Sequence, residues 1–159
     1  AFKMAKKAGK ITILNPAPAV EEIPEELLKY TDIITPNETE SAKITGIQIK
    51  DKSSLAANAE KLHLLGVKNV VITYGDKGSY ISTKDIETLI PAYKVEATDT
   101  TGAGDTFIGY LASNLNEDLS NFEDAAKIAS RASSIAVQRL GAQPSIPTAQ
   151  EVEQAMEDE

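Results

Sequence analysis

Short apolar runs alternate along this chain with segments of helical periodicity, and this alternation constrains the fold more than any other feature of the sequence. Strands are predicted over residues 11–14, 32–35 and 69–74, and the last of these contains the β-branched run Val70-Val71-Ile72. Such a run is typical of a strand buried in a parallel sheet. Because helical patterns separate the strands, the sequence predicts an α/β domain with a largely parallel sheet.

Helix ends are marked by capping and breaking residues. Asn37 can cap a helix that Gly46 ends, and Ser53 or Ser54 can cap the next helix. The side-chain oxygen of such a residue accepts a hydrogen bond from an N–H group in the first helical turn, which has no partner within the helix. The starts of both helices are therefore predicted from side-chain chemistry.

The remaining boundaries follow from turn residues and the apolar pattern. A turn over residues 75–78 leads into a hairpin partner over 79–82, and further extended structure is predicted from Thr88 to Val95. Further helices are predicted for residues 1–9, 24–28, 102–115, 122–140 and 148–156. Because a natural chain rarely starts inside a helix, this one is expected to be part of a longer protein.

The overall composition limits the class of protein. The 159 residues suffice for one domain with a substantial core, and 42% hydrophobic with 25% charged residues is the balance of a globular protein. A formal net charge of −8 argues against a nucleic-acid partner, and no apolar run reaches the length of a membrane span. Without cysteine the chain can form neither a disulfide nor a thiolate metal site, which fits a reducing compartment.

The stretch over residues 99–107 carries the clearest chemical signal. Gly102, Ala103 and Gly104 are small residues that enter a helix, where backbone N–H groups lack intrahelical partners and attract an anion. Asp105 follows at once, and its carboxylate can accept a hydroxyl proton beside this anion hole. An anion hole with a base at its edge indicates phosphoryl transfer. The alternative, that Asp105 merely caps a helix after a flexible turn, stays open.

This stretch closely resembles the second signature of the ribokinase-like (phosphofructokinase B) carbohydrate kinases. Four other segments match motifs of that family in the same order: Asn15–Ala19, Thr35–Glu40, Thr73–Gly78 and Gly141–Pro147. The resemblance covers essentially the whole chain and implies a Rossmann-like three-layer α/β/α sandwich with a mostly parallel sheet. It identifies residues 1–159 as the C-terminal, nucleotide-binding and catalytic part of a single domain, without the lid and the N-terminal half.

The resemblance implies a role for each matching residue. Asp105 is expected to be the catalytic base that contacts the sugar hydroxyl, with Gly102, Ala103 and Gly104 as the anion hole. Asn37 is expected near the ATP phosphates, and Glu40 is expected to order the water shell of Mg²⁺. The other residues expected to bind the nucleotide are Thr73, Tyr74, Gly75, Asp76, Lys77, Gly78, Gly104 and Ser130. Taken alone, residues 75–78 favour a plain hairpin turn, and Glu40 would be an ordinary first-turn carboxylate.

A monovalent-cation site beside the anion hole is also implied by the resemblance. Its expected ligands are the Asp99 carboxylate, the carbonyl groups of Thr101, Ala136, Arg139 and Gly141, and Ser145. A K⁺ ion there would fix the loop before the helix and strengthen the local positive field. The alternative is that Asp99 caps a turn and Gly141 ends a helix.

The function implied is that of an ATP-dependent sugar kinase with Mg²⁺ and K⁺ as cofactors. The acceptor favoured by the matching loops is ribose, giving ribose 5-phosphate; fructose, deoxyribose and a nucleoside are alternatives, and so is a non-catalytic nucleotide-binding module. The full-length protein is expected to be a cytoplasmic homodimer. Because the sugar-holding residues of the family lie in its N-terminal half, this chain is predicted to be inactive alone. The only histidine, His63, is expected to be structural or exposed.

Overall fold

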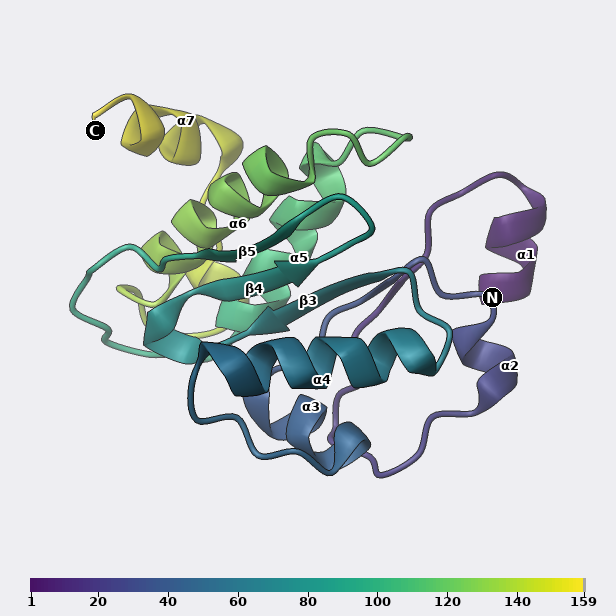
Figure 1. Cartoon of the computed structure of the whole chain (residues 1–159). Coiled ribbons are helices and arrows are strands. Elements are labelled where there is room, and N and C mark those ends of the chain that lie inside the picture. Colours follow the sequence, from purple (N-terminus) through teal and green to yellow (C-terminus); the bar gives the residue numbers. More distant parts are fainter. Residues whose placement is uncertain (159) are drawn as a thin grey trace. The chain divides into compact units, whose positions relative to one another are not determined.

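The computed structural model describes residues 1–158, which form two compact units (Figure 1). The first unit contains residues 1–75 and 79–89, and the second contains residues 76–78 and the chain from residue 90 onward. The strands are β1 (Ile13–Leu14), β2 (Ile33–Ile34), β3 (Asn69–Thr73), β4 (Ser79–Ser82) and β5 (Glu87–Ile90). The helices are α1 (Phe2–Lys7), α2 (Glu25–Leu28), α3 (Glu38–Thr45), α4 (Lys52–Leu64), α5 (Ala103–Asn114), α6 (Phe122–Ala136) and α7 (Ala149–Glu157). Two 3₁₀ turns, η1 (Gly75–Lys77) and η2 (Gln143–Ser145), complete the elements.

A mixed five-stranded sheet, in the order β1-β2-β3-β4-β5, forms the centre of the first unit. The first three strands are parallel, with Ile13 opposite Ile33 and Ile34 opposite Val70, whereas β3 and β4 pair antiparallel. The predicted α/β class, the parallel strands and the 79–82 hairpin partner are therefore confirmed. The predicted extension to Val95 is too long, because β5 ends at Ile90.

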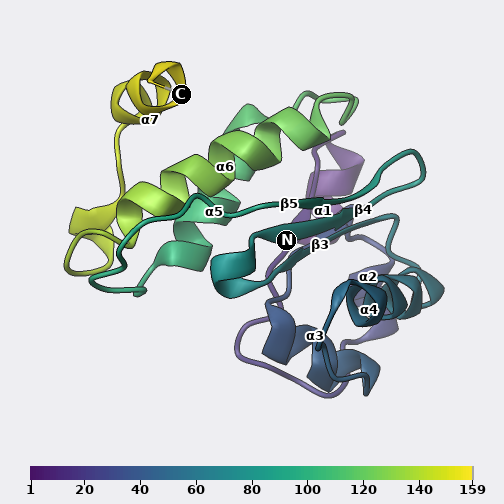
Figure 2. The same ribbon diagram turned by 60° about the vertical axis from the view of Figure 1, so that its left-hand side comes forward.

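Helices α3 and α4 lie on one face of this sheet (Figures 1 and 2). The apolar side chains of α4 recur at positions 55, 59 and 62, so one stripe of the helix faces inward. The fully or nearly fully buried core beneath it consists of Leu28, Ile34, Leu55, Ala59, Leu62, Val67, Val70, Ile72 and Tyr80. His63, as expected, has a structural role: Nδ1 lies 2.8 Å from the Val67 carbonyl oxygen and Nε2 2.9 Å from the Ser82 hydroxyl.

A buried amide joins the helices of this unit to each other. Asn58 of α4 is fully buried, and its Oδ1 accepts hydrogen bonds from the hydroxyl groups of Ser41 (2.8 Å) and Thr45 (2.6 Å) on α3. Its Nδ2 donates to the carbonyl oxygens of Ile47 (3.1 Å) and Ser54 (2.8 Å). Since an amide has two donors and two acceptor sites, this side chain is fully satisfied.

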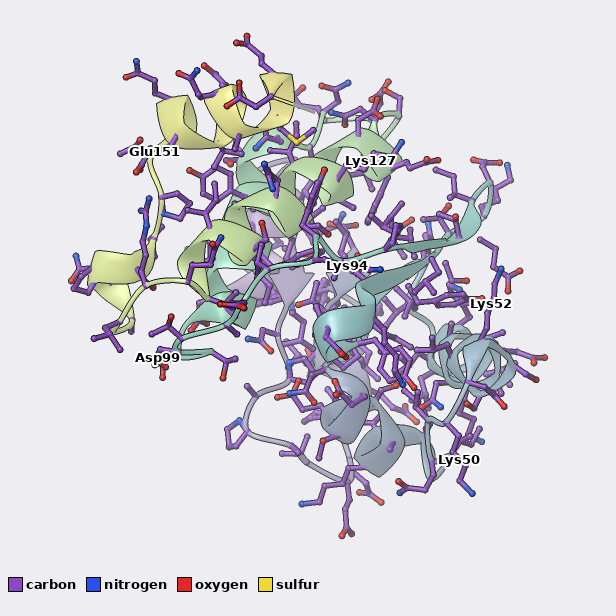
Figure 3. All side chains as sticks on the ribbon, turned by 90° about the vertical axis from the view of Figure 1, so that its left-hand side faces the viewer. Lys50, Lys52, Lys94, Asp99, Lys127 and Glu151 are labelled. Carbon is purple, nitrogen blue, oxygen red and sulfur yellow. The ribbon has the colours of Figure 1, made fainter. Side chains whose placement is uncertain are left out.

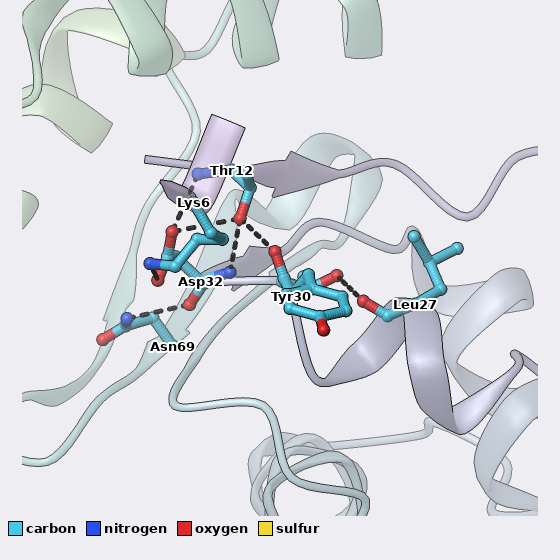
Figure 4. Close-up of polar contacts among 7 residues, drawn as sticks. Lys6, Thr12, Leu27, Tyr30, Asp32 and Asn69 are labelled. Atoms are coloured by element: carbon cyan, nitrogen blue, oxygen red, sulfur yellow. Dashed lines mark hydrogen bonds and ion pairs between the residues drawn. The ribbon is translucent and has the colours of Figure 1, made fainter. Parts of the chain in front are cut away.

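Asp32 joins α1, β1 and β2 at the start of the sheet (Figure 4). Its Oδ1 pairs with Lys6 Nζ at 2.6 Å, and its Oδ2 accepts from the N–H (2.9 Å) and the hydroxyl (3.0 Å) of Thr12. The Asp32 carbonyl oxygen in turn accepts a hydrogen bond from Asn69 Nδ2 at 2.9 Å. The three parallel strands are therefore tied together by polar contacts where they begin.

In the second unit, α5 and α6 pack along each other (Figures 1 and 2). The buried positions of α6 are mostly small, among them Ala125, Ala129 and Ala132, and small residues allow two helices to approach closely. Arg131 fastens α7 to α6, because its guanidinium donates to the Ala155 carbonyl oxygen from both Nε and Nη2. Within residues 1–158, no helix combines the length and the apolar character that crossing a membrane requires.

Two predicted helix boundaries are wrong, for different reasons. Asp51, not Ser53 or Ser54, caps α4: its carboxylate accepts the Ser54 N–H at 2.8 Å, and the Ser54 hydroxyl accepts the Asp51 N–H at 2.9 Å. This reciprocal pair is a capping box, so Ser54 contributes as the third helical residue.

Helix α6 ends at Ala136 rather than at residue 140. A continuing helix would bond the Val137 carbonyl to the Gly141 N–H. Instead the Val137 carbonyl accepts the N–H groups of Thr98 (2.7 Å) and Asp99 (3.0 Å), and the Gly141 N–H donates to Asp99 Oδ2 (2.9 Å). The chain therefore leaves the helix because a distant loop takes its hydrogen bonds.

Candidate active site

In the first unit, Asn37 and Glu40 form a capping box directly after β2. Asn37 Oδ1 accepts the Glu40 N–H at 2.8 Å, and Glu40 Oε2 accepts the Asn37 N–H at 2.8 Å. The predicted cap at Asn37 is confirmed, and the spacing from Asn37 to Glu40 is the sequence signal of the reciprocal bond. Glu40 is buried, and its second carboxylate oxygen accepts no hydrogen bond from residues 1–158. One oxygen of Glu40 thus remains open to a further ligand.

The end of β3 lies beside this capping box. Thr73 forms a parallel bridge with Asn37, and its N–H donates to the Pro36 carbonyl oxygen at 3.0 Å. A side chain at Gly75 would lie 3.8 Å from the Glu38 carboxylate. These residues therefore meet at the carboxyl ends of β2 and β3, the edge where open parallel sheets bind ligands. Half-buried Tyr74, between Thr73 and Gly75, packs against the core beneath.

Asp76, Lys77 and Gly78 continue this turn in the second unit. Asp76 and Lys77 are exposed. Gly78 has a φ of +113°, and a Cβ there would lie only 1.9 Å from the Ile90 carbonyl oxygen. Glycine is therefore required at residue 78 by the close approach of the chain's own backbone.

The glycine-rich stretch begins α5 in the second unit. Gly102 is the N-cap in the left-handed conformation (φ +77°), and no side chain caps the helix. The Ala103 N–H donates to the Thr100 carbonyl oxygen at 3.2 Å, but the N–H groups of Gly102, Gly104 and Asp105 meet no acceptor among residues 1–158. Gly104 and Asp105 are exposed. This arrangement presents unpaired donors at the positive end of a helix dipole, which attracts an anion.

Asp105 stands beside these donors, in the first turn of α5. Its carboxylate makes no hydrogen bond or ion pair with residues 1–158, and the structure shows no capping bond at α5. The alternative interpretation of Asp105 as a helix cap is therefore not what the structure shows. Its oxygens are free to accept a proton or a hydrogen bond from a bound hydroxyl.

Asp99 fixes the loop that leads into this helix (Figure 3). Its Oδ1 accepts the Thr101 N–H and its Oδ2 the Gly141 N–H, both at 2.9 Å. Hydrogen bonding from Thr101 and from the Gly141 N–H holds the pKa of the Asp99 carboxyl below its ordinary value, so it is ionised near neutral pH. The carboxylate links the loop before α5 to the segment after α6.

The other expected cation ligands lie on that segment. Ala136 is the last residue of α6, and Arg139 follows it with a side chain that pairs with Glu151 at 2.6 Å. Ser145 is fully buried in η2, where its hydroxyl donates to the Ala142 carbonyl oxygen at 2.6 Å. The structure thus joins Asp99 directly to Thr101 and Gly141, and it leaves Ser145 bonded to its own turn. No group of three or more His, Cys, Asp or Glu residues within 1–158 could hold a metal ion.

Two serines of α6 complete the candidate residues. Ser130, expected at the nucleotide, is buried. Ser133, which the sequence does not single out, donates its hydroxyl to the Ala103 carbonyl oxygen at 3.0 Å and so contacts the glycine-rich stretch. No local pattern signals this contact, because it joins residues of two different helices.

Comparisons with known proteins identify the family of the chain. The model of the pfkB family carbohydrate kinases matches residues 1–149. The bifunctional ribokinase/ribose-5-phosphate isomerase A of Fructilactobacillus sanfranciscensis is 57% identical over 148 residues, 93% of this chain and 27% of that protein. The ribokinase of Staphylococcus aureus is 49% identical over 154 residues, 97% of this chain and 50% of that protein.

A solved structure gives the same picture of the fold. The structure of Arabidopsis thaliana ribokinase complexed with ribose and ATP superposes with a TM-score of 0.88 at 35% identity, covering 96% of this chain and 49% of that one. The chain therefore spans about half the length, or less, of the relatives it matches.

Proposed function

The chain belongs to the pfkB family of carbohydrate kinases, and we propose that it carries the phosphoryl-transfer residues of an ATP-dependent sugar kinase. The observation that carries this proposal is the start of α5. There the unpaired N–H groups of Gly104 and Asp105 adjoin a carboxylate that has no partner within residues 1–158. The start of α5 therefore provides both a general base and a site that stabilises negative charge, and phosphoryl transfer uses both.

In the proposed reaction, Asp105 accepts the proton of a sugar hydroxyl. The hydroxyl oxygen forms a bond to the γ-phosphorus of ATP while the bond from that phosphorus to the β,γ-bridging oxygen breaks. The products are a sugar phosphate and ADP. The N–H groups of Gly102 and Gly104 are proposed to donate hydrogen bonds to the transferring group and so stabilise its negative charge. The Ala103 N–H between them stays bonded to the Thr100 carbonyl oxygen.

A separate role toward the nucleotide is proposed for each residue that the family resemblance indicates. Asn37, with Thr73 beside it, lies at the ligand-binding edge of the sheet and is proposed to contact ATP phosphates. Glu40 retains one open carboxylate oxygen, which fits a role in ordering water on Mg²⁺. Mg²⁺ neutralises phosphate charge when it is bound. The exposed turn from Gly75 to Lys77 is proposed to pass along the nucleotide, with buried Ser130 as a further nucleotide residue.

A monovalent cation is proposed at Asp99, and the donor set fits one. Each Asp99 oxygen accepts one N–H and keeps capacity for a further ligand. The other proposed donors are carbonyl groups and the Ser145 hydroxyl, which are hard oxygen ligands. Bound there, K⁺ would add positive charge beside the start of α5. A K⁺ titration of the complete protein should raise its kinase activity, and the Asp99→Ala variant should not respond.

Ribose is the proposed acceptor, with ribose 5-phosphate as the product. The support is that two relatives are named for ribokinase activity and that the Arabidopsis structure is complexed with ribose and ATP. Because the chain spans about half of the S. aureus relative, we propose that sugar binding needs the remaining half. The 159-residue chain should then bind ATP but phosphorylate ribose at a negligible rate. We also propose a cytoplasmic homodimer for the complete protein, which light scattering would test.

Replacement of Asp105 by Asn in the complete gene product tests the proposed base. We expect ribose phosphorylation to fall about 10²–10⁴-fold, because the amide cannot accept the proton, while the Kd for ATP stays within about twofold. Asp124→Asn is the matched control, since Asp124 occupies the same third position of α6, and it should leave the rate unchanged. A D105N protein that phosphorylates ribose at the wild-type rate would overturn the role of Asp105.

A further inference from the structure

Ser133 is the one serine of a neighbouring pair whose hydroxyl leaves its own helix. On α6, Ser134 Oγ donates to the Arg131 carbonyl oxygen at 2.7 Å, within the helix. Ser133 Oγ instead donates to the Ala103 carbonyl oxygen on α5, at 3.0 Å. It therefore contacts the backbone of the glycine-rich stretch from a second, separately anchored helix.

The atom that accepts this hydrogen bond matters because of peptide geometry. The Ala103 carbonyl group and the Gly104 N–H group belong to one peptide unit, which is planar and rigid. A hydrogen bond to the carbonyl oxygen therefore fixes the direction of the Gly104 N–H. It also polarises the peptide, because hydrogen bonds in series strengthen one another, so the N–H becomes a better donor.

The Gly104 N–H is one of the unpaired donors at the start of α5. It has no acceptor within residues 1–158, and glycine has no side chain to restrict the backbone. Asp99 fixes the loop upstream, at the Thr101 N–H. Ser133 contacts the next turn from α6, in addition to the backbone bonds of that turn.

We propose that Ser133 is a positioning residue for the anion hole: it orients and polarises the Ala103–Gly104 peptide so that the Gly104 N–H binds a phosphoryl oxygen. The inference rests on the proposed function, because it concerns the same anion hole. A serine that only packs α5 against α6 would affect stability and nothing else. A positioning serine affects the Gly104 amide and the affinity for an anion.

The test is a titration of the ¹⁵N-labelled 159-residue chain with inorganic phosphate, followed at the Gly104 and Asp105 amide signals. The wild type should show saturable shifts at both amides. Ser133→Ala should weaken phosphate binding about 5–10-fold, because it removes the hydrogen bond that strengthens the Gly104 N–H as a donor. The same variant should also move the Gly104 signal before phosphate is added. Ser133→Thr keeps the hydroxyl and should restore the Kd to within about twofold of the wild type.

Ser134→Ala is the matched control, and it should bind phosphate as the wild type does. Ser133→Cys provides a second variant of similar size with a weak donor, and it should lie between S133A and the wild type. Wild-type affinity in S133A and S133C would overturn the role of Ser133 and leave the anion hole standing. A wild-type chain whose Gly104 and Asp105 amides do not respond to phosphate would overturn the anion hole itself, and with it this inference.

Discussion

Gly102 and Gly104 are glycines for different physical reasons. Gly102 adopts φ +77°, a left-handed conformation that favours glycine, and a Cβ there would lie 3.4 Å from Ala142 Cα. Gly104 has a helical backbone, and a Cβ there would meet nothing within 4 Å. At an exposed helical position alanine is more favourable than glycine by about 1 kcal/mol. The fold therefore gives no reason for glycine at residue 104, whereas the close approach of a ligand to the backbone does.

Replacement of Gly104 by Ala should separate stability from ligand binding. We expect the free energy of unfolding to rise by up to about 1 kcal/mol, and the affinity for ATP to fall, because the methyl group obstructs the phosphate. Thermal unfolding and calorimetric titration of the chain measure the two effects. Gly109→Ala is the control, since Gly109 lies exposed in the same helix with equal space around it, and it should gain stability without losing affinity. Equal ATP affinity in G104A and the wild type would contradict the proposed role.

Asp32 should make the stability of the chain depend on acid pH. Burial raises the pKa of its carboxyl, but hydrogen bonds from Lys6 and Thr12 outweigh burial and hold the pKa below its ordinary value of 3.8. The unfolded chain therefore binds the proton more readily than the folded one. The stabilisation is present above about pH 4 and is lost as pH falls through the folded-state pKa.

The variant Asp32→Asn removes this titration. At pH 7 its free energy of unfolding should be about 1–3 kcal/mol below that of the wild type, because hydrogen bonds to a charged group are lost. The difference should shrink as pH falls below 4. Urea unfolding at a series of pH values measures both, with the exposed Asp85→Asn variant as control. A difference in unfolding free energy between D32N and the wild type that does not change with pH would rule out the proposed titration of Asp32.

At the scale of elements, local chemistry predicts where helices start better than where they end. The starts of α3 and α7 follow from Asn37 and Thr148, each of which forms a capping box. At α4 three capping residues lie close together, and the reciprocal bond between Asp51 and Ser54 decides among them. The end of α6 could not be predicted, because the Val137 carbonyl is taken by a loop distant in sequence.

The buried amide of Asn58 should be the most sensitive polar position between α3 and α4. Asn58→Asp places an oxygen against the carbonyl oxygens of Ile47 and Ser54, where the amide group donates to both. We expect the free energy of unfolding to fall by about 3 kcal/mol or more, since one oxygen of the buried carboxylate then faces two carbonyl oxygens and has no donor. Urea unfolding measures the loss. In the exposed Ser53→Ala variant on the same helix, the free energy of unfolding should change by less than about 0.5 kcal/mol. A similarly small loss of unfolding free energy in N58D would refute the expectation.

At the scale of the whole molecule, motifs in order along the chain predicted the family and the α/β fold. The pfkB family match over residues 1–149 and the similarity to the Arabidopsis structure confirm both. The candidate site was less completely predictable. The sequence points to Gly102–Asp105, but it does not show that the Thr100 carbonyl takes the Ala103 N–H. The contact of Ser133 with the Ala103 carbonyl could not be predicted either, because it joins two helices. Gly78 likewise matched a nucleotide motif, although the approach of Ile90 already requires a glycine there.

We propose that this chain provides the phosphoryl-transfer residues of a sugar kinase and is not a nucleotide-binding module without catalysis. The most direct test follows ATP and ribose by ³¹P NMR in the presence of the complete gene product and Mg²⁺. A sugar monophosphate signal and ADP should appear in equal amounts, and neither should form when ribose is omitted. Binding of ATP with no sugar phosphate formed, under conditions where the protein is folded, would contradict the proposal.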